Sequence, residues 1–203
     1  MVAAGQIGFL PIDLGRWDRC PGGDALVVPV WADVRPLRGA AGLLDWRLNG
    51  RLSRLLREGR LEGTTGEKLL FFTTRVPWRR VLTIGLGATT SFSEDAFRTS
   101  LGVVLDAFRG LGIQSVGLAL PGRDMDRITP ERALRVLISV AEQREEQFPG
   151  TALSGLTIID VPPAIKAMVE TVRAIERSLA RCLVLPFPCA RNRSTLNFCV
   201  WGF

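Results

Sequence analysis

The 203-residue chain contains no histidine and no tyrosine. Histidine is the only side chain whose ordinary pKa lies near neutral pH, and it is the commonest metal ligand. Its absence excludes a Ser-His-Asp triad, a Cys-His pair and an HExxH zinc site. The only lysines are Lys68 and Lys166, so most of the positive charge is arginine, which does not act as a base. We therefore predict no catalytic residues, and a domain that binds or assembles.

Long apolar runs and metal-type cysteine spacings are also missing. No run approaches the roughly 20 residues that a membrane helix needs, and the first residues lack the pattern of a secretory signal. The four cysteines show no C-x2-C spacing, and the acidic residues form no convincing metal cluster. Asp124 and Asp126 are expected to pair with Arg123 and Arg127 in their own loop. These features predict a cytoplasmic protein with free thiols, no metal and no membrane contact.

Positive charge is in excess, with 26 lysine and arginine residues against 20 acidic residues and a net charge of +6. The excess permits contact with nucleic acid or acidic surfaces. Four arginines are spaced so that they would share one helix face: Arg47, Arg51, Arg54 and Arg57. Such a stripe can follow phosphate groups, with binding that weakens as salt rises. The alternative is a solvated polar face opposite the leucines of the same helix.

A second basic group surrounds an aromatic residue. Arg75, Arg79 and Arg80 flank Trp78. An indole among arginines can stack on a nucleic-acid base. A surface turn is the alternative interpretation.

Gly85 and Gly87 form a G-x-G step directly after an apolar run. Backbone N–H groups at such a turn can hold a phosphate when a helix follows. The full G-x-G-x-x-G motif is not met, because Thr90 stands where the third glycine would be, and no lysine supplies a Walker-type loop. Two interpretations stay open, a phosphate site at Gly85 and Gly87 or a tight turn between strand and loop.

Apolar runs predict six strands, at residues 6–12, 25–31, 68–74, 81–87, 115–120 and 156–160. Helical spacing predicts helices at residues 43–57, from a Ser91–Glu94 capping box to about residue 111, at 130–148 and at 163–181. Strands and helices alternate from residue 81 onward, which is typical of a sheet covered by helices on both faces. The sequence thus predicts one α/β domain, a three-layer sandwich with a mixed central sheet.

Several segments, taken in order, resemble the N-terminal domain of the leucyl (cytosol) aminopeptidase family. They are DALVVPVW, PLRGAAGLLDWRLNGRLSRLL, GEKLLFFTT, RRVLTIGLG and SEDAFRTSLGVVLDAFRGLGIQSVGLALPG. The resemblance covers about residues 6–180 and implies a macro-domain-like fold. It divides the chain into a macro-like domain at residues 1–181 and an irregular apolar tail at 182–203.

The family's catalytic domain, with its NTDAEGRL motif and two metal ions, has no counterpart among these residues. No catalytic or metal-binding residue is therefore carried over, and the two divalent metals would belong to the missing domain. The resemblance implies a non-catalytic domain that acts in self-association, as a homo-oligomer, or docks to a peptidase partner. Two alternatives stay open: part of a metal-dependent leucyl aminopeptidase whose catalytic domain is absent from this chain, and a nucleic-acid-binding module that uses the arginine stripe.

Overall fold

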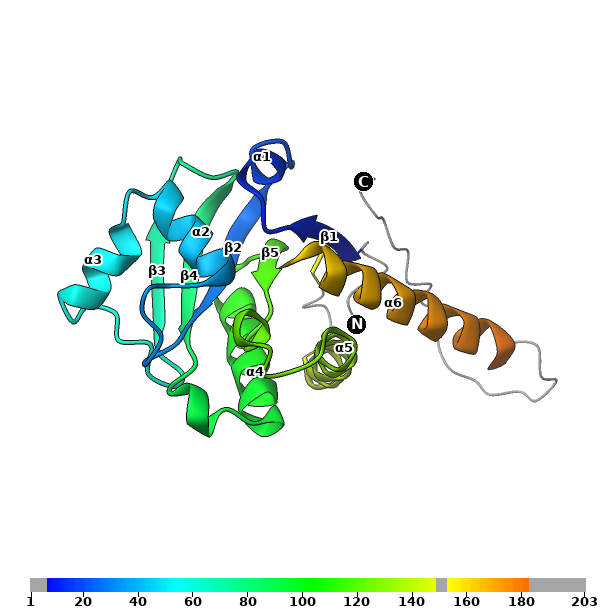
Figure 1. Cartoon of the computed structure of the whole chain (residues 1–203). Helices are drawn as coiled ribbons and strands as arrows, with labels where there is room; N and C mark the ends of the chain where they lie inside the picture. The colour runs from blue at the N-terminus through cyan, green and yellow to red at the C-terminus, as the bar shows by residue number, and fades with distance from the viewer. Residues whose placement is uncertain (1–6, 149–152, 183–203) are drawn as a thin grey trace.

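A computed structural model describes residues 7–148 and 153–182 of the chain (Figure 1). In this part of the chain, six strands form one sheet in the order β1-β6-β5-β2-β4-β3. Their bounds are β1 Ile7–Pro11, β2 Gly23–Val30, β3 Lys68–Phe72, β4 Trp78–Gly85, β5 Ser115–Ala119 and β6 Gly155–Asp160. Every neighbouring pair is parallel except β3 and β4, which are antiparallel. The predicted mixed sheet is confirmed.

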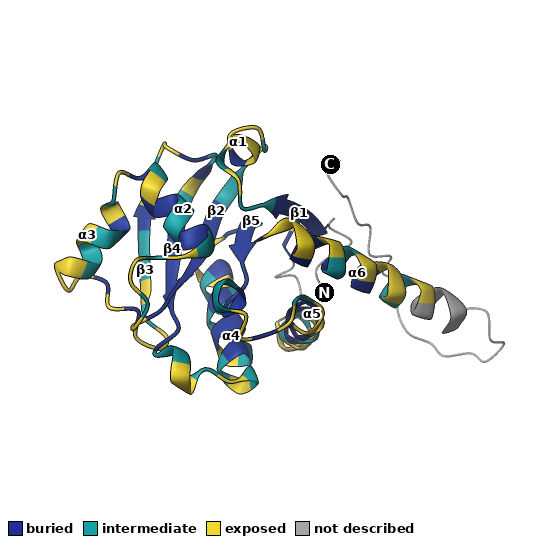
Figure 2. Cartoon of the chain, viewed as in Figure 1, coloured by how far each residue is buried: buried dark blue, intermediate teal, exposed yellow. Residues whose placement is uncertain are grey.

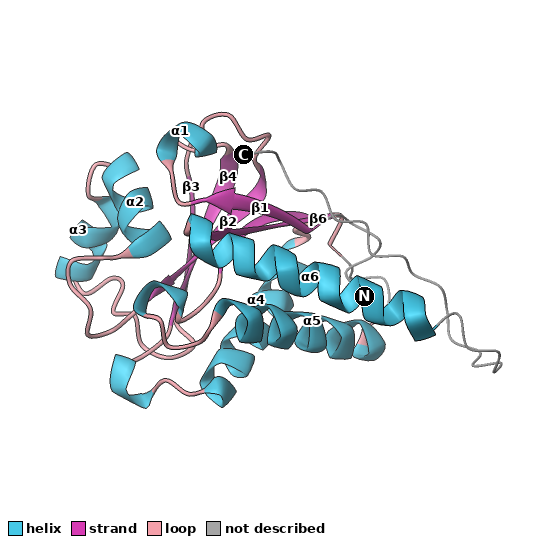
Figure 3. Cartoon of the chain, turned by 45° about the vertical axis from the view of Figure 1, so that its right-hand side comes forward, coloured by secondary structure: helices cyan, strands magenta, loops and turns pink. Residues whose placement is uncertain are grey.

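Helices cover both faces of the sheet, as a three-layer sandwich requires. The longer ones, α4 Glu94–Leu111, α5 Pro130–Gln147 and α6 Pro162–Cys182, lie together on one face, and α2 Gly39–Arg47 and α3 Arg51–Arg57 lie on the other (Figure 3). A short helix, α1 Leu14–Trp17, packs on the α2 side. None of the described helices is both long enough and apolar enough to span a membrane.

Strand β2 shows why the sheet must be covered twice. Ala25 and Val27 face the core beneath α4 and α5, whereas Leu26 and Val28 face the core beneath α2. All four are buried, as Figure 2 shows for the centre of the sheet. A continuous run of apolar residues is what a strand buried on both faces needs.

The helix predicted at residues 43–57 is wrong as a single element, because the structure has α2 and α3 with a break between them. Asn49 and Gly50 adopt positive φ angles of 56° and 73°, which end α2. The buried carboxylate of Asp45 then accepts the N–H groups of Leu52 and Ser53, so it caps the first turn of α3.

The other helix ends follow their sequence signals with one correction. Ser93, not Ser91, caps α4 by accepting the N–H of Ala96, and Gly112 ends that helix in the left-handed conformation. Thr129 caps α5, whose start at Pro130 agrees with the predicted helix, by accepting the N–H of Arg132. The tail predicted at 182–203 lies outside the described residues except for its first residue, which ends α6.

Candidate functional site

One end of the molecule, which we call the basic end, collects the excess positive charge. It consists of α2, α3, β3 and the β3–β4 hairpin, and it corresponds to residues 35–80. This segment holds 11 of the 26 basic residues and only 4 of the 20 acidic ones. Two of those four acidic side chains accept hydrogen bonds from the backbone of this segment. Asp45 caps α3, and Glu67 accepts the N–H groups of residues 62–64. The surface of this end is therefore dominated by arginine.

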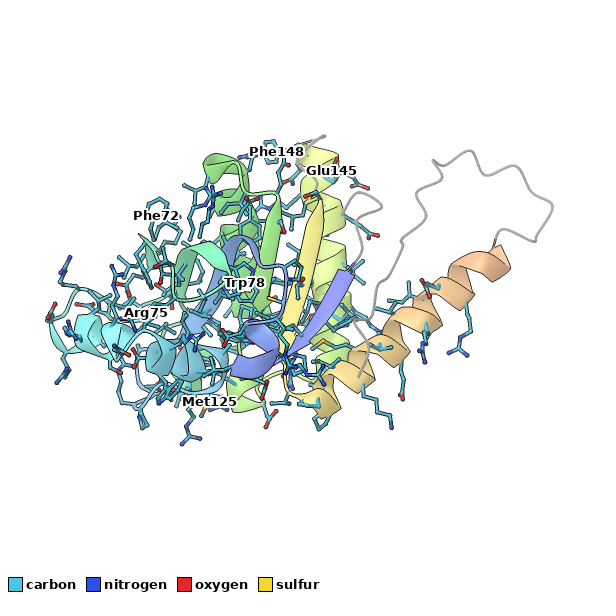
Figure 4. All side chains as sticks on the ribbon, turned by 90° about the horizontal axis from the view of Figure 1, so that it is seen from above. Phe72, Arg75, Trp78, Met125, Glu145 and Phe148 are labelled. Carbon is cyan, nitrogen blue, oxygen red and sulfur yellow. The ribbon has the colours of Figure 1, made fainter. Side chains whose placement is uncertain are left out.

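Two large aromatic side chains lie exposed at the basic end. Trp46 is 70% exposed and Phe72 is 71% exposed, the highest values among the exposed large apolar residues of the described chain. Trp46 borders an open groove of about 840 Å³ between the α2–α3 junction and the β3–β4 hairpin, together with Arg47 and Arg75. Figure 4 labels Phe72 and Arg75 at this end.

The four predicted stripe arginines are present at this end but not on one helix. Arg47 belongs to α2, where it pairs with the carboxylate of Asp18 and donates to the carbonyl of Arg75. Arg51 starts α3, and its guanidinium lies 4.5 Å from the centre of the Phe71 ring. Arg54 and Arg57 are exposed on α3, and neither has an ion-pair partner within the described residues. Binding of nucleic acid by these arginines stays a prediction.

Trp78 cannot stack on a base, so that part of the prediction is wrong. Its side chain is 1% exposed and makes an edge-to-face contact with Trp17 at 5.8 Å between ring centres. Trp78 begins β4 rather than lying in a surface turn, so its indole packs into the core. The exposed aromatics that sequence reasoning missed are Trp46 and Phe72. Trp46 falls off the leucine stripe of its helix, and Phe72 alternates with the buried Phe71, so both signals were present.

A second concave site lies at the carboxyl ends of β2, β5 and β6. The order of the strands reverses between β2 and β5, and such a switch point is where open α/β sheets bind ligands. The crevice there has a volume of about 340 Å³ and is bordered by the start of α2 and by the loop after β5. Its position in the fold makes the crevice a candidate ligand site. Whether it suits a ligand depends on the charged groups that line it.

Charged groups in this crevice are largely engaged with the protein itself. Arg123 donates from Nε to the buried carboxylate of Asp160 at 2.9 Å, and from Nη1 to the carbonyl of Ile128 at 2.6 Å. Both carboxylate oxygens of Asp124 lie 3.0 Å from the indole nitrogen of Trp31, which donates to them. Burial raises the pKa of Asp124 above its ordinary value. The prediction that Asp124 pairs with a neighbouring arginine in its loop is therefore replaced by these longer-range partners.

The crevice is poorly suited to an anion. Three carboxylates border it, those of Asp124, Asp126 and Asp160. The loop after β5 also packs tightly on the start of α2, as shown by the 2.9 Å that would separate a Cβ added at Gly39 from the Cβ of Asp124. Only Arg38 and the already paired Arg123 supply positive charge. Within the residues described, no group of three or more cysteine, aspartate and glutamate side chains is placed to hold a metal ion.

The glycines predicted to hold a phosphate lie at the end of β4, against the loop of residues 63–65. Gly85 donates its N–H to the carbonyl of Glu67, and Gly87 donates to that of Gly63. A Cβ at Gly85 would lie 1.9 Å from the carbonyl oxygen of Thr64. Glycine is therefore needed here for close backbone packing, and a phosphate would have to compete with these hydrogen bonds. The phosphate site stays a prediction.

Solved structures similar to this chain support the fold. A Trypanosoma brucei macrodomain in complex with ADP-ribose has a TM-score of 0.60 at 21% identity, covering 84% of this chain and 79% of that one. A tomato leucine aminopeptidase variant has a TM-score of 0.52 at 16% identity, covering 89% of this chain and 38% of that one. At these identities the similarity establishes the macro-domain-like fold.

Sequence comparison goes further. A probable cytosol aminopeptidase of Nitrosomonas europaea is 31% identical over 170 residues, which cover 78% of this chain and 33% of that protein. This chain thus spans about a third of the length of that relative. The profile of the cytosol aminopeptidase family, N-terminal domain, matches residues 27–151. The chain therefore belongs to the cytosol aminopeptidase family and corresponds to the N-terminal domain of its members.

Proposed function

We propose that the chain is a non-catalytic docking domain that binds another polypeptide through its basic end. The observation that carries the proposal is the exposure of Trp46 and Phe72 among arginines. Tryptophan and arginine are the residues most enriched at the energetic centres of protein interfaces. Two bulky aromatic side chains left in water at one end of the molecule are explained if a partner covers them.

Charge indicates what kind of partner fits. Two copies that met through their basic ends would bring like charges together, which opposes association. An acidic surface would instead be attracted from a distance and held in register. A full-length cytosol aminopeptidase is the partner that family membership favours. We propose that this docking takes place in the cytoplasm. If the chain instead forms a homo-oligomer, the basic end of one copy would have to contact a different, acidic face of the second copy.

Peptide hydrolysis is the activity of the longer relatives' class, and this chain covers only about a third of such a protein. If the chain takes part in it, the two divalent metals and the catalytic groups would come from a separate catalytic domain. No cofactor is assigned to the residues of this chain. The docking proposal is compatible with such a role, since a docking domain can join a catalytic partner.

Nucleic acid is the second candidate partner of the same surface. Arg54 and Arg57 have no ion-pair partner among the described residues, and Trp46 is exposed beside a groove, as single-strand binding would require. Nucleic-acid binding can be distinguished from docking to a polypeptide by its dependence on salt. The affinity of the chain for nucleic acid must fall steeply as salt rises, because counterions return to the phosphates.

The test is light scattering of the purified chain, alone and mixed with a full-length cytosol aminopeptidase from the same organism. The expected result is a mixed complex that is lost in the Trp46→Ala/Phe72→Ala variant. Phe148→Ala is the matched control, because Phe148 is also an exposed aromatic (40%) beside an arginine but lies outside the basic end. A chain that stays monomeric and forms no complex with the peptidase would contradict the proposal.

A further inference from the structure

Strand β3 leaves one edge of the sheet open. In the part of the chain that the structure describes, it is the last strand in the sheet, and its only neighbour is β4 (Figure 1). In an antiparallel pair, successive residues direct their N–H and C=O groups alternately toward the neighbour and away from it. The alternation in β3 therefore determines which peptide groups are available to a further strand.

The hydrogen bonds beside β3 fix that alternation. Glu67 accepts the N–H of Gly85 at 2.8 Å, and Thr73 donates to the carbonyl of Arg79 at 3.2 Å. Residues 67 and 73 thus face β4, and so do residues 69 and 71 between them, in the observed register. The peptide groups of Lys68, Leu70 and Phe72 consequently face outward.

These outward groups are almost entirely unoccupied. Within the described residues, the single hydrogen bond that reaches them runs from the Arg51 guanidinium to the carbonyl of Phe72, at a long 3.4 Å. Neither a proline nor a positive-φ residue interrupts β3 itself. Unprotected edges of this kind are templates for strand addition.

The side chains along the edge divide by face. Leu69 and Phe71 point toward the α2–α3 layer, whereas Leu70 packs toward the opposite core and Phe72 extends beyond it into solvent. Above the first face lie the exposed arginines of α3, and Arg51 already reaches the edge. A strand added here would meet arginines on one face and apolar side chains on the other.

We infer that the free edge of β3 binds an extended acidic segment of a partner polypeptide by strand addition. The inference rests on the proposed docking function, and it specifies that the partner binds by strand addition and that the bound segment is acidic. Outward N–H and C=O groups at Lys68 and Leu70 supply the main-chain hydrogen bonds, as in other complexes formed by strand addition. Alternate acidic side chains of the segment meet Arg51 and Arg54, and alternate apolar ones meet Leu70 and Phe72. The positive charge of residues 35–80 disfavours a second copy of β3 as the occupant.

A fluorescent ten-residue peptide of alternating glutamate and valine is the probe, with alternating lysine and valine as its charge control. Leu70→Pro removes one outward N–H, and proline is tolerated on a strand edge where that group faces solvent. Leu70→Val keeps the N–H and is the matched control. The expected result is at least a tenfold loss of affinity in Leu70→Pro, less than a threefold loss in Leu70→Val, and no binding of the lysine peptide. Affinity within twofold of the original chain in a folded Leu70→Pro variant would overturn the inference.

Amide hydrogen exchange of the unaltered chain gives a second readout that needs no variant. Binding of the glutamate peptide should slow exchange at Lys68, Leu70 and Phe72 while Leu69 and Phe71, already bonded to β4, change little. Protection confined to other segments would overturn strand addition. If Leu70→Pro still binds the peptidase while Trp46→Ala/Phe72→Ala does not, docking holds and strand addition fails. If a twenty-nucleotide oligothymidylate binds in place of the peptide, with a steep loss in salt, both proposals fail and the surface is a nucleic-acid site.

Discussion

The crevice at the carboxyl ends of the strands and the basic end use charge in opposite ways. In the crevice, Arg123 and Asp160 are buried and bonded to each other, and Asp124 is held by the indole of Trp31. At the basic end, Arg54 and Arg57 lie in solvent and acids are scarce. Opposite charges that pair inside the protein stabilise its fold. Exposed charges of one sign, without partners in the chain, are available to another molecule. The position of the crevice in the fold is therefore not enough to propose it as the binding site.

The largest expected effect is loss of stability when the crevice pair is broken. Arg123→Met leaves the Asp160 carboxylate buried without its cation, and removal of one partner of a buried pair costs about 3–5 kcal/mol. Urea unfolding followed by circular dichroism measures this cost. Asp126→Asn is the control, because Asp126 pairs with the same arginine but is 90% exposed, and we expect a change of at most about 1 kcal/mol. Equal effects of the two variants would show that the buried pair does not hold the crevice.

The cap at the break between α2 and α3 should have an intermediate effect. Asp45→Ala removes the acceptor of two α3 N–H groups in a buried position and should cost about 1–2 kcal/mol. The measurement is the same urea titration. Because α3 carries Arg54 and Arg57, the variant should also weaken peptidase binding, and unchanged binding would separate the cap from the docking surface.

A smaller effect should appear in the pH dependence of stability through Asp124. Burial raises the pKa of Asp124 in the folded chain, so the folded state holds this proton more tightly than the unfolded state. The contribution of Asp124 is therefore most favourable below its ordinary pKa and is lost as pH rises through the raised value. Asp124→Asn should be more stable than the original chain at neutral pH, and the gain should vanish in acid. A gain that grew as pH fell would contradict this assignment.

The smallest effect on stability is expected from the exposed aromatics. Trp46→Ala/Phe72→Ala should change the free energy of unfolding by no more than about 0.5 kcal/mol, because both side chains are already in water. Thermal and urea unfolding check this expectation. A large loss of stability would mean that the two residues belong to the core and that their exposure says nothing about a partner.

Local patterns predicted most of the fold. The apolar run at residues 25–31 became the doubly buried β2, and Thr129 and Gly112 mark helix ends where their chemistry favours them. These features depend on neighbours in the sequence, so they can be read before any tertiary contact is known.

The remaining features depend on contacts between distant residues. Arg123 and Asp160 are 37 positions apart, and nothing local indicates that the arginine turns away from Asp124. Trp78 begins β4, and its buried state depends on Trp17, which lies in helix α1. The break at Asn49 and Gly50 was readable, since an Asn-Gly pair favours positive φ, but the leucine spacing on either side concealed it.

The most direct test of the account measures two quantities in one variant, Arg54→Glu/Arg57→Glu. Both side chains are exposed and lie at the basic end, so charge reversal should leave the free energy of unfolding within about 0.5 kcal/mol of the original. The affinity for the full-length cytosol aminopeptidase, measured by titration calorimetry, should fall at least tenfold. Unchanged affinity with unchanged stability would contradict the claim that unpaired positive charge at this end serves to bind a partner.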